Sequence, residues 1–324
     1  MQFFGEFIAL FVAISWTFTA LFFEYASNKV GSLPVNLIRL LIGFVLLGVF
    51  LLIATGSFLP VGADSKTWMW MLLSGVVGFV FGDFCLFYSY TVMSARFSQL
   101  FMTLAPPFAA LFGWILLDET LSINALLGML VTLSGIAISV LKRGGANNVV
   151  TDDSHSKGER KNAALKVSIP LIGVLLGIGA ALGQGLGIVL SKVGMGYYEL
   201  SPEVVPENAK FIPFAATQIR VIAGIAGFTI LIIISGRVKS VIKAFKDRKG
   251  LAAISGGAFF GPFLGVSLSL TAVQHTNAAV ASTIMATTPI LILVPYTLFY
   301  KKKVTKAEVL GAILSVCGVI MFFL

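Results

Sequence analysis

Charge is scarce in this chain of 324 residues, and its scarcity excludes a water-soluble protein. Charged residues account for 11% of the sequence, hydrophobic residues account for 57%, and the mean hydropathy is +0.97. A soluble domain of this length needs more charge than that to solvate its surface. We therefore expect the lipid bilayer to be the solvent and the fold class to be an all-α integral membrane protein.

Histidine and cysteine are also scarce, with two residues of each. His155 and His275 lie in a polar stretch and at the end of an apolar one, while Cys85 and Cys317 lie far apart inside apolar stretches. No Ser-His-acid set, nucleotide-binding loop or metal-ligand spacing includes them. The sequence therefore predicts no catalytic residues, no metal site and no other cofactor, and it disfavours an intramembrane enzyme.

The clearest pattern that is present is a repeat. Residues 98–141 align without a gap on residues 281–324, and each copy is two apolar stretches joined by a short charged turn. The residues that control backbone shape coincide at one offset: Pro106 with Pro289, Gly128 with Gly311, Gly135 with Gly318, Gly78 with Gly261, and Gly82 with Gly265. Each copy is interpreted as a helical hairpin in a membrane, and the chain as a duplicated unit.

A membrane span needs about 20 mostly apolar residues, and this length accommodates ten. We place them at 3–23, 33–54, 68–90, 95–116, 123–141, 168–190, 213–235, 251–272, 277–299 and 305–324. The stretch 142–166 is rich in Gly, Asn, Asp, Ser and Lys, so we expect a solvated linker between a first repeat at 1–141 and a second at 167–324. Residues 194–212 are an insertion in the second repeat. No Lys or Arg precedes the first span, so we expect a retained helix and no signal peptide.

Positive charge predicts the orientation. Of the 23 Lys and Arg residues, 18 fall in odd-numbered loops and three in even-numbered loops, while Arg39 and Arg220 fall within spans. By the positive-inside rule the odd loops are cytoplasmic and both termini face outward. With five spans in each half, the second repeat is inverted relative to the first. The net charge of +9 is then a topological signal beside anionic lipid, and nucleic acid is not an expected partner.

This duplicated five-helix unit resembles the EamA family of the drug/metabolite transporter superfamily. The residues that carry the resemblance are Pro106, the turn Asp118-Glu119-Thr120-Leu121, Gly128 and Gly135 in the first copy, and Pro289, Gly311 and Gly318 in the second. Arg39 and Arg220 sit where such repeats often carry a basic residue. The second copy departs from the family pattern, because Glu119 falls on Lys302. Several relatives are also thought to keep their termini in the cytoplasm, which is the opposite of the orientation that the charge count predicts.

The resemblance implies a function. It implies a multi-pass secondary transporter in the cell (inner or plasma) membrane, which exports a small metabolite such as an amino acid or a similar polar solute by alternating access. The rival that it leaves open is a translocator of lipids or lipid-linked sugars with the same fold, which requires a groove that opens sideways to lipid.

Asp83 is the strongest candidate for a functional side chain, because it is the only acid well inside an expected span. A charge at that depth costs at least about 3 kcal/mol, so we expect Asp83 to face the bundle interior or water. Tyr90 lies on the same helical face. Asp83 is interpreted as a substrate-binding group that exchanges protons, which makes protons a candidate coupling ion; the alternative is a protonated, purely structural aspartate. Its counterpart in the second copy is Val266.

Five further residues are candidates for contact with the substrate. Trp16 and Gln184 lie mid-span at comparable places in the two halves, which suits a site at the membrane midplane. Thr287, close before Pro289, is a further substrate-binding candidate, although a threonine in a helix often bonds its own backbone. Arg39 and Arg220, one expected near each membrane face, either bind an anion, close a gate or snorkel to headgroups.

Small residues recur in the last span of each half. Gly128 and Gly135 lie on one face of the fifth span, and Gly311 and Gly318 repeat them on the tenth. Such spacing lets two helices approach closely. We predict that these glycines form a packing seam, either within the chain or between protomers.

Overall fold

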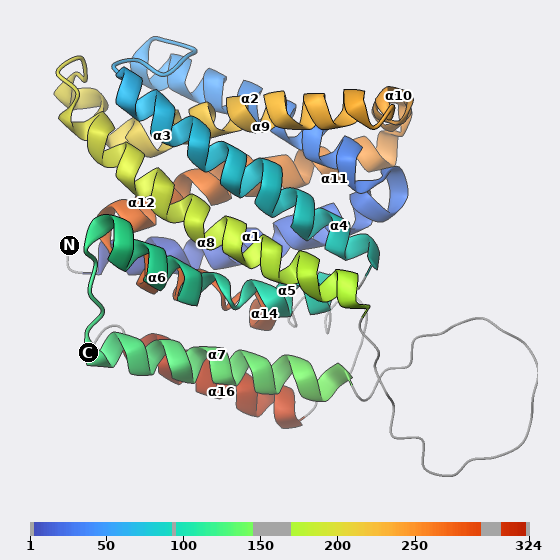
Figure 1. Cartoon of the computed structure of the whole chain (residues 1–324), viewed down its shortest axis with the longest axis vertical. Coiled ribbons are helices and arrows are strands. Elements are labelled where there is room, and N and C mark those ends of the chain that lie inside the picture. Colours follow the sequence, from blue (N-terminus) through green and yellow to red (C-terminus); the bar gives the residue numbers. More distant parts are fainter. Residues whose placement is uncertain (1–2, 93–94, 145–169, 293–305, 322–324) are drawn as a thin grey trace, which may run out of the picture.

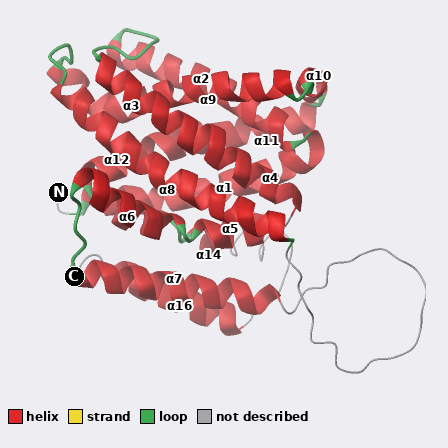
Figure 2. Ribbon diagram, in the orientation of Figure 1, coloured by secondary structure: helices red, strands yellow, loops and turns green. Residues whose placement is uncertain are grey.

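The computed structural model describes residues 3–92, 95–144, 170–292 and 306–321, and within these ranges the chain is helical with no strand (Figure 2). The first half contains α1 (Phe4–Val30), α2 (Ser32–Thr55), α3 (Ser65–Gly75), the π-helix η1 (Val76–Asp83), α4 (Phe84–Val92), α5 (Ala95–Met102), α6 (Ala105–Leu117) and α7 (Ile123–Gly144). The second half contains α8 (Leu171–Leu200), the 3₁₀ helix η2 (Pro206–Phe211), α9 (Ile212–Ile234), α10 (Val238–Lys246), α11 (Arg248–Ala258), the π-helix η3 (Phe259–Gly265), α12 (Val266–His275), α13 (Ala278–Met285), α14 (Thr288–Leu291) and α16 (Lys306–Ile320).

Six helical stretches of the described residues are long and apolar enough to cross a membrane. They are Phe4–Val30, Ser32–Thr55, Ser65–Val92, Leu171–Leu200, Pro206–Ile234 and Arg248–His275. Shorter apolar helices cover Ala105–Leu117, Ile123–Ile138 and Val309–Ile320. The chain is therefore an all-helical membrane protein, as predicted, whereas the count of ten spans stays a prediction.

Two of the expected spans are interrupted by a proline. The fourth span is split into α5 and α6, and the ninth into α13 and α14. In each case the proline, Pro106 or Pro289, is the second residue after the interruption. Proline lacks an N–H group and is best accommodated in the first turn of a helix, so a new helix starts there. The rest of the ninth span, residues 293–299, lies outside the described residues.

The interruptions match between the halves. The π-helices η1 and η3 begin at Val76 and Phe259, and the proline breaks follow Met102 and Met285. Both pairs are separated by the offset that the sequence repeat predicts. This agreement supports the duplicated unit, because π-turns are rare and placed by specific local packing. The π-helix η1 packs with its backbone directly against that of α8, since a Cβ on Gly183 of α8 would lie 2.6 Å from the Cα of Gly82 in η1.

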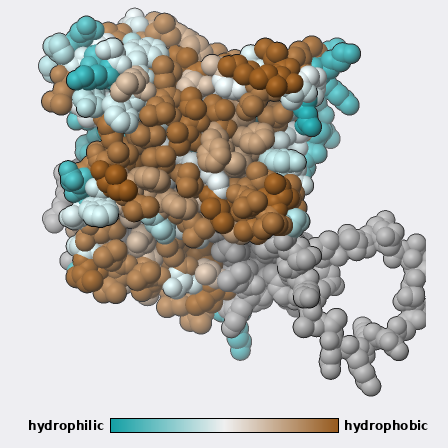
Figure 3. Space-filling model, in the orientation of Figure 1, coloured by the Kyte–Doolittle hydropathy of each residue, from teal (hydrophilic) through white to brown (hydrophobic). Residues whose placement is uncertain are grey.

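The long helices lie side by side across Figure 1, so that each end of the bundle gathers its own set of loops. The N and C labels are at the left, and α10 is at the right. Lys29, at the end of α1, pairs with Asp247 at 3.1 Å, before α11. The backbone amide of Gly250 and the Lys29 ammonium hold the pKa of the Asp247 carboxyl below its usual value. Figure 3 shows an apolar surface between polar patches near these two ends, as a membrane-embedded body requires.

The seam of small residues lies between α7 and α16, which pack side by side at the bottom of Figure 1. A Cβ on Gly135 would lie 2.6 Å from the carbonyl oxygen of Gly311, and one on Gly318 would lie 2.7 Å from that of Gly128. Ser315 donates a hydrogen bond of 3.1 Å to the carbonyl oxygen of Thr132. The four glycines therefore lie at a contact within the chain.

Candidate functional site

The π-helix η1 ends at Asp83, which is buried with 5% of its surface exposed. Arg39 of α2 forms an ion pair with Oδ2 of this carboxylate through Nη2. Gln184 of α8 donates a hydrogen bond of 2.7 Å from Nε2 to Oδ1. Both carboxylate oxygens are thus occupied, and three residues that the sequence singled out separately meet at one point. Asp83 faces the interior of the bundle, as predicted.

Arg39 is held on all sides by side chains of the bundle. Its Nε donates a hydrogen bond of 3.0 Å to Oδ1 of Asn36, one turn earlier in α2. Its guanidinium carbon lies 4.7 Å from the ring centroid of Phe87, 5.5 Å from that of Phe23 and 5.7 Å from that of Phe79. Aromatic faces attract a guanidinium group and replace part of its lost hydration. Only 4% of Arg39 is exposed, so its side chain does not reach the headgroup region.

A cavity with about 620 Å³ of space not filled by protein atoms opens beside this ion pair. Its lining comprises Trp16, Thr19, Ala20, Phe23, Arg39, Phe79, Asp83, Leu86, Phe87, Tyr90, Gln99, Met102, Gln184, Gly261 and Val266. A second cavity of about 490 Å³ shares Trp16, Gln99, Met102 and Gln184 with it. The lining is mostly apolar with a few converging polar groups, which is the composition of small-molecule sites.

Four of the five proposed substrate-binding residues line this cavity. These four are Trp16, Asp83, Tyr90 and Gln184, and Arg39 also lines the cavity. Thr287 does not line either cavity, and its hydroxyl donates at 2.7 Å to the carbonyl oxygen of Ile284. This is the local backbone bond that threonine favours in a helix.

Polar residues that the sequence analysis did not select also line the cavities, and two of them are Thr288 and Gln99. Thr288 lines the second cavity. Gln99 lines both cavities and donates to the Tyr90 hydroxyl at 2.8 Å. A glutamine inside an expected span was a usable signal for the latter.

The placement expected for the two arginines is wrong. The sequence analysis put Arg39 and Arg220 near opposite membrane faces, but the guanidinium carbon of Arg220 lies 4.8 Å from the centroid of Phe79, the ring that Arg39 also contacts. Two groups that share one ring cannot lie at opposite faces of a hydrocarbon core about 30 Å thick. Only 4% of each is exposed. Both side chains turn inward because the buried Asp83 carboxylate and the aromatic rings lie there.

A polar network lies at the opposite end of the bundle from α10. Glu119, in the turn between α6 and α7, pairs through Oε1 with Lys192 of α8 at 2.5 Å. Its Oε2 accepts a hydrogen bond of 3.0 Å from the backbone amide of Ala278, the first residue of α13. Lys192 also donates to the carbonyl oxygen of Thr276 at 2.5 Å, and the Thr276 hydroxyl donates to Glu6 of α1 at 2.7 Å. This network joins helices of both halves across one end of the bundle.

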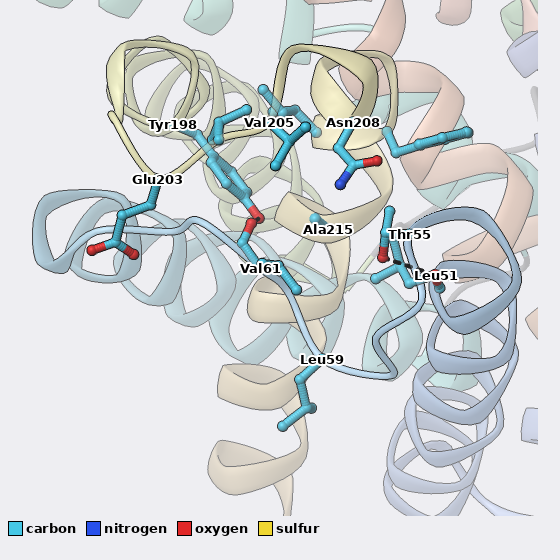
Figure 4. A pocket seen from close by; sticks show the side chains of 12 residues that line it. Leu51, Thr55, Leu59, Val61, Tyr198, Glu203, Val205, Asn208 and Ala215 are labelled. Carbon is cyan, nitrogen blue, oxygen red and sulfur yellow. Dashed lines mark hydrogen bonds between the residues drawn. The ribbon is translucent and has the colours of Figure 1, made fainter.

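A further pocket, of about 360 Å³, lies where the insertion at 194–212 meets the loop after α2. Tyr198 donates a hydrogen bond of 2.7 Å to the carbonyl oxygen of Val61, which anchors the insertion to that loop. In Figure 4 Asn208 faces the pocket, whereas the Glu203 carboxylate points away from it. Most of its lining is aliphatic, and it lacks the paired charges that mark the cavity at Asp83.

Comparisons with known proteins agree on the kind of protein. The model of the EamA-like transporter family matches residues 3–141 and 171–324. The protein named "Uncharacterized transporter YoaV" from Bacillus subtilis (strain 168) is 29% identical over 138 residues, which are 41% of this chain and 45% of that protein. The matched part of this chain thus spans less than half the length of that relative. A solved crystal structure with 16% identity superposes with a TM-score of 0.67 over 98% of this chain and 95% of the other, which supports the fold alone.

Proposed function

Because the chain belongs to the EamA-like transporter family, it is a membrane transporter, and we propose that it is a secondary transporter of a small polar solute, which binds in the cavity at Asp83. The solute class is an amino acid or a similar compact polar molecule, and the proposed direction is export across the plasma membrane. In this proposal Trp16, Tyr90 and Gln184 contact the solute with Asp83, and Thr288 takes the place expected for Thr287.

The observation that carries this proposal is the buried ion pair at the cavity wall. An aspartate and an arginine inside a membrane-embedded bundle are costly to bury, and such pairs mark solute or ion pathways. Asp83 and Arg39 both line the cavity, so a polar solute meets charged groups there. Aromatic rings from Phe23, Phe79 and Phe87 surround the pair and lower the local dielectric, which strengthens charge recognition.

The two ends of the bundle differ, and the difference supports alternating access. The cavity lies toward the end that carries α10, because Arg39 is near the start of α2 and Tyr90 is near the end of α4. The other end is closed by the network of Glu119 and Lys192. A carrier needs a solute site that is open toward one side while the other side is shut. A cavity near one end and a polar network across the other end are what we expect of one such state.

Counterflow in liposomes tests the proposal. Purified protein is reconstituted with an unlabelled amino acid inside, and uptake of the labelled amino acid is followed over a panel that also contains sugars. We expect at least one amino acid to accumulate transiently in wild-type liposomes and none with Asp83→Ala. Asp64→Ala is the matched control, since Asp64 caps α3 outside the spans and should leave counterflow intact.

Two outcomes contradict the proposal. Movement of fluorescent phospholipid without exchange of any solute identifies the lipid translocator instead. Counterflow that survives Asp83→Ala unchanged removes the cavity at Asp83 from the transport path.

A further inference from the structure

Charge is unbalanced around the ring of Phe79. The guanidinium carbons of Arg39 and Arg220 lie 5.7 and 4.8 Å from its centroid. The acid hydrogen-bonded in this cluster is Asp83, and its two oxygens are taken by Arg39 and Gln184. Among the residues that the structure describes, no carboxylate pairs with Arg220. One buried positive charge is therefore left without a direct partner.

Arg220 is buried with a donor unsatisfied. Only 4% of the residue is exposed, and its Nε has no hydrogen-bond partner. The guanidinium group packs against the backbone of Gly78, where a Cβ would lie 2.9 Å from Nη2 of Arg220. A buried guanidinium group without a counterion costs several kcal/mol, and an unmade hydrogen bond adds to that cost. An anion brought to this group would offset both costs.

We propose that Arg220 binds an anionic group of the transported solute, and that the solute is therefore a carboxylate-bearing molecule such as a zwitterion. This inference rests on the proposed function and narrows its solute class. A guanidinium group offers a planar fork of N–H donors that matches a carboxylate in two parallel hydrogen bonds. Arg39 is the weaker candidate, because Asp83 and Asn36 already engage it. Arg220 is thus the specificity-determining cation of the site.

Phe79 separates Arg220 from the cavity. The ring lines the cavity and also lies under the Arg220 guanidinium group, and Gln184, a second lining residue, donates to the backbone oxygen of Gly78 at 3.4 Å. In this proposal, rotation of the Phe79 side chain exposes the Arg220 guanidinium group to the cavity. The solute carboxylate then reaches Arg220, while its polar remainder stays beside Asp83 and Gln184.

Thermal unfolding of the purified full-length protein tests the inference with acetate as the carboxylate probe. Melting temperatures are compared in sodium acetate and in sodium chloride of equal ionic strength. We expect acetate to raise the melting temperature of the wild type. In chloride, Arg220→Met should melt at least about 2 °C higher than the wild type, because an uncompensated charge is gone, and acetate should no longer stabilise it.

Arg39→Met is the matched control and should behave in the opposite way. It leaves Asp83 without its cation, so it should melt lower in chloride and retain the response to acetate. If Arg220→Met does not fold, Arg220→Gln keeps a polar side chain of similar length and should lose the acetate response in the same way. A wild type that acetate does not stabilise, or an Arg220 variant that retains the full response, overturns the inference.

Counterflow separates failure of this inference from failure of the proposed function. Amino acids and their uncharged-carboxyl amides are compared in the same liposomes. We expect the acids to exchange at least tenfold faster than the amides in wild type, and this ratio to fall toward one in Arg220→Gln. Equal exchange of acids and amides in wild type contradicts the role of Arg220 but leaves the carrier intact. Absence of all exchange contradicts the proposed function itself.

Discussion

Glu119 offers the sharpest test of how the bundle closes at the end opposite α10. Its carboxylate pairs with Lys192 at 2.5 Å and accepts from the Ala278 amide at 3.0 Å, so one side chain ties α8 to α13. Glu119→Gln keeps the length of the side chain and removes its charge. We expect the variant to open at this end more often, because the ion pair is made only while the end is closed.

The size of the effect follows from burial. The side chains of Lys192 and Glu119 are 20% and 12% exposed, so the pair lies between a solvated pair, worth about 0–1 kcal/mol, and a buried pair, whose disruption costs about 3–5 kcal/mol. Hydrogen bonds to charged groups contribute about 1.5–3 kcal/mol. A loss of about 1–2 kcal/mol from the closed form raises the open population by roughly 5- to 30-fold.

Cysteine labelling measures that population. Ile188 lies one helical turn before Lys192 and lines the second cavity, so Ile188→Cys in a background that lacks Cys85 and Cys317 reports access to the cavity. A membrane-impermeant maleimide is applied separately to right-side-out and inside-out vesicles. Labelling should accelerate by about 5- to 30-fold from one side only. Lys66→Gln, at the same end but outside the network, should leave the rate unchanged.

Equal rates for Glu119→Gln and wild type from both sides would refute the closing role of the pair. Faster labelling with Lys66→Gln would instead point to a general loosening of this end. Vesicles with equal amounts of inserted protein make the rates comparable.

Three further predictions concern orientation, coupling and packing. A reporter active only in the cytoplasm should be silent after Leu324 and active within 142–166; the opposite pair of results reverses the orientation. Asp83→Asn should abolish accumulation driven by a pH gradient while solute-for-solute exchange partly survives; equal gradient-driven uptake in variant and wild type removes the proton role. Gly135→Leu should separate α7 from α16 and lower the melting temperature by several degrees, since a Cβ at this position would lie 2.6 Å from the backbone of α16. An unchanged melting temperature contradicts a tight seam.

Much of the architecture could be predicted because composition and backbone chemistry are local. A shortage of charge requires a membrane, and the family resemblance read from Pro106, Gly128 and their counterparts is confirmed by the family match. The same residues predict features of the backbone, since a proline is best accommodated in the first turn of a helix. The structure breaks α5 from α6 and α13 from α14 at those prolines. The sequence analysis nevertheless predicts one continuous span across each break, because hydropathy does not detect a missing backbone hydrogen bond.

The site was predicted only in part. Contacts between residues that are distant in the sequence leave no local signal in it. Asp83 could be chosen by its depth alone, since any acid within a span needs a partner. The partners themselves could not be predicted, because Arg39 and Gln184 are 44 and 101 positions away from Asp83 in the sequence. Arg220 was misplaced for the same reason. Counting residues from a span end gives the height of a Cα atom, whereas a long side chain is directed by the charges and rings that the fold brings to it.

The two halves share the positions of their backbone interruptions but not a set of polar groups, and this asymmetry supports the proposed site at Asp83. In the first half η1 ends at Asp83 and packs on α8 beside Gln184. In the second half the residue that aligns with Asp83 is Val266, directly after η3, and the group beside it is Trp16, since a Cβ on Gly265 would lie 2.7 Å from the Trp16 Nε1. Trp16 and Gln184 thus take comparable positions against opposite π-helices. In the proposed transport cycle, matching backbones would let the halves exchange conformations at little cost, while a single charged cluster would give the solute one place to bind in both.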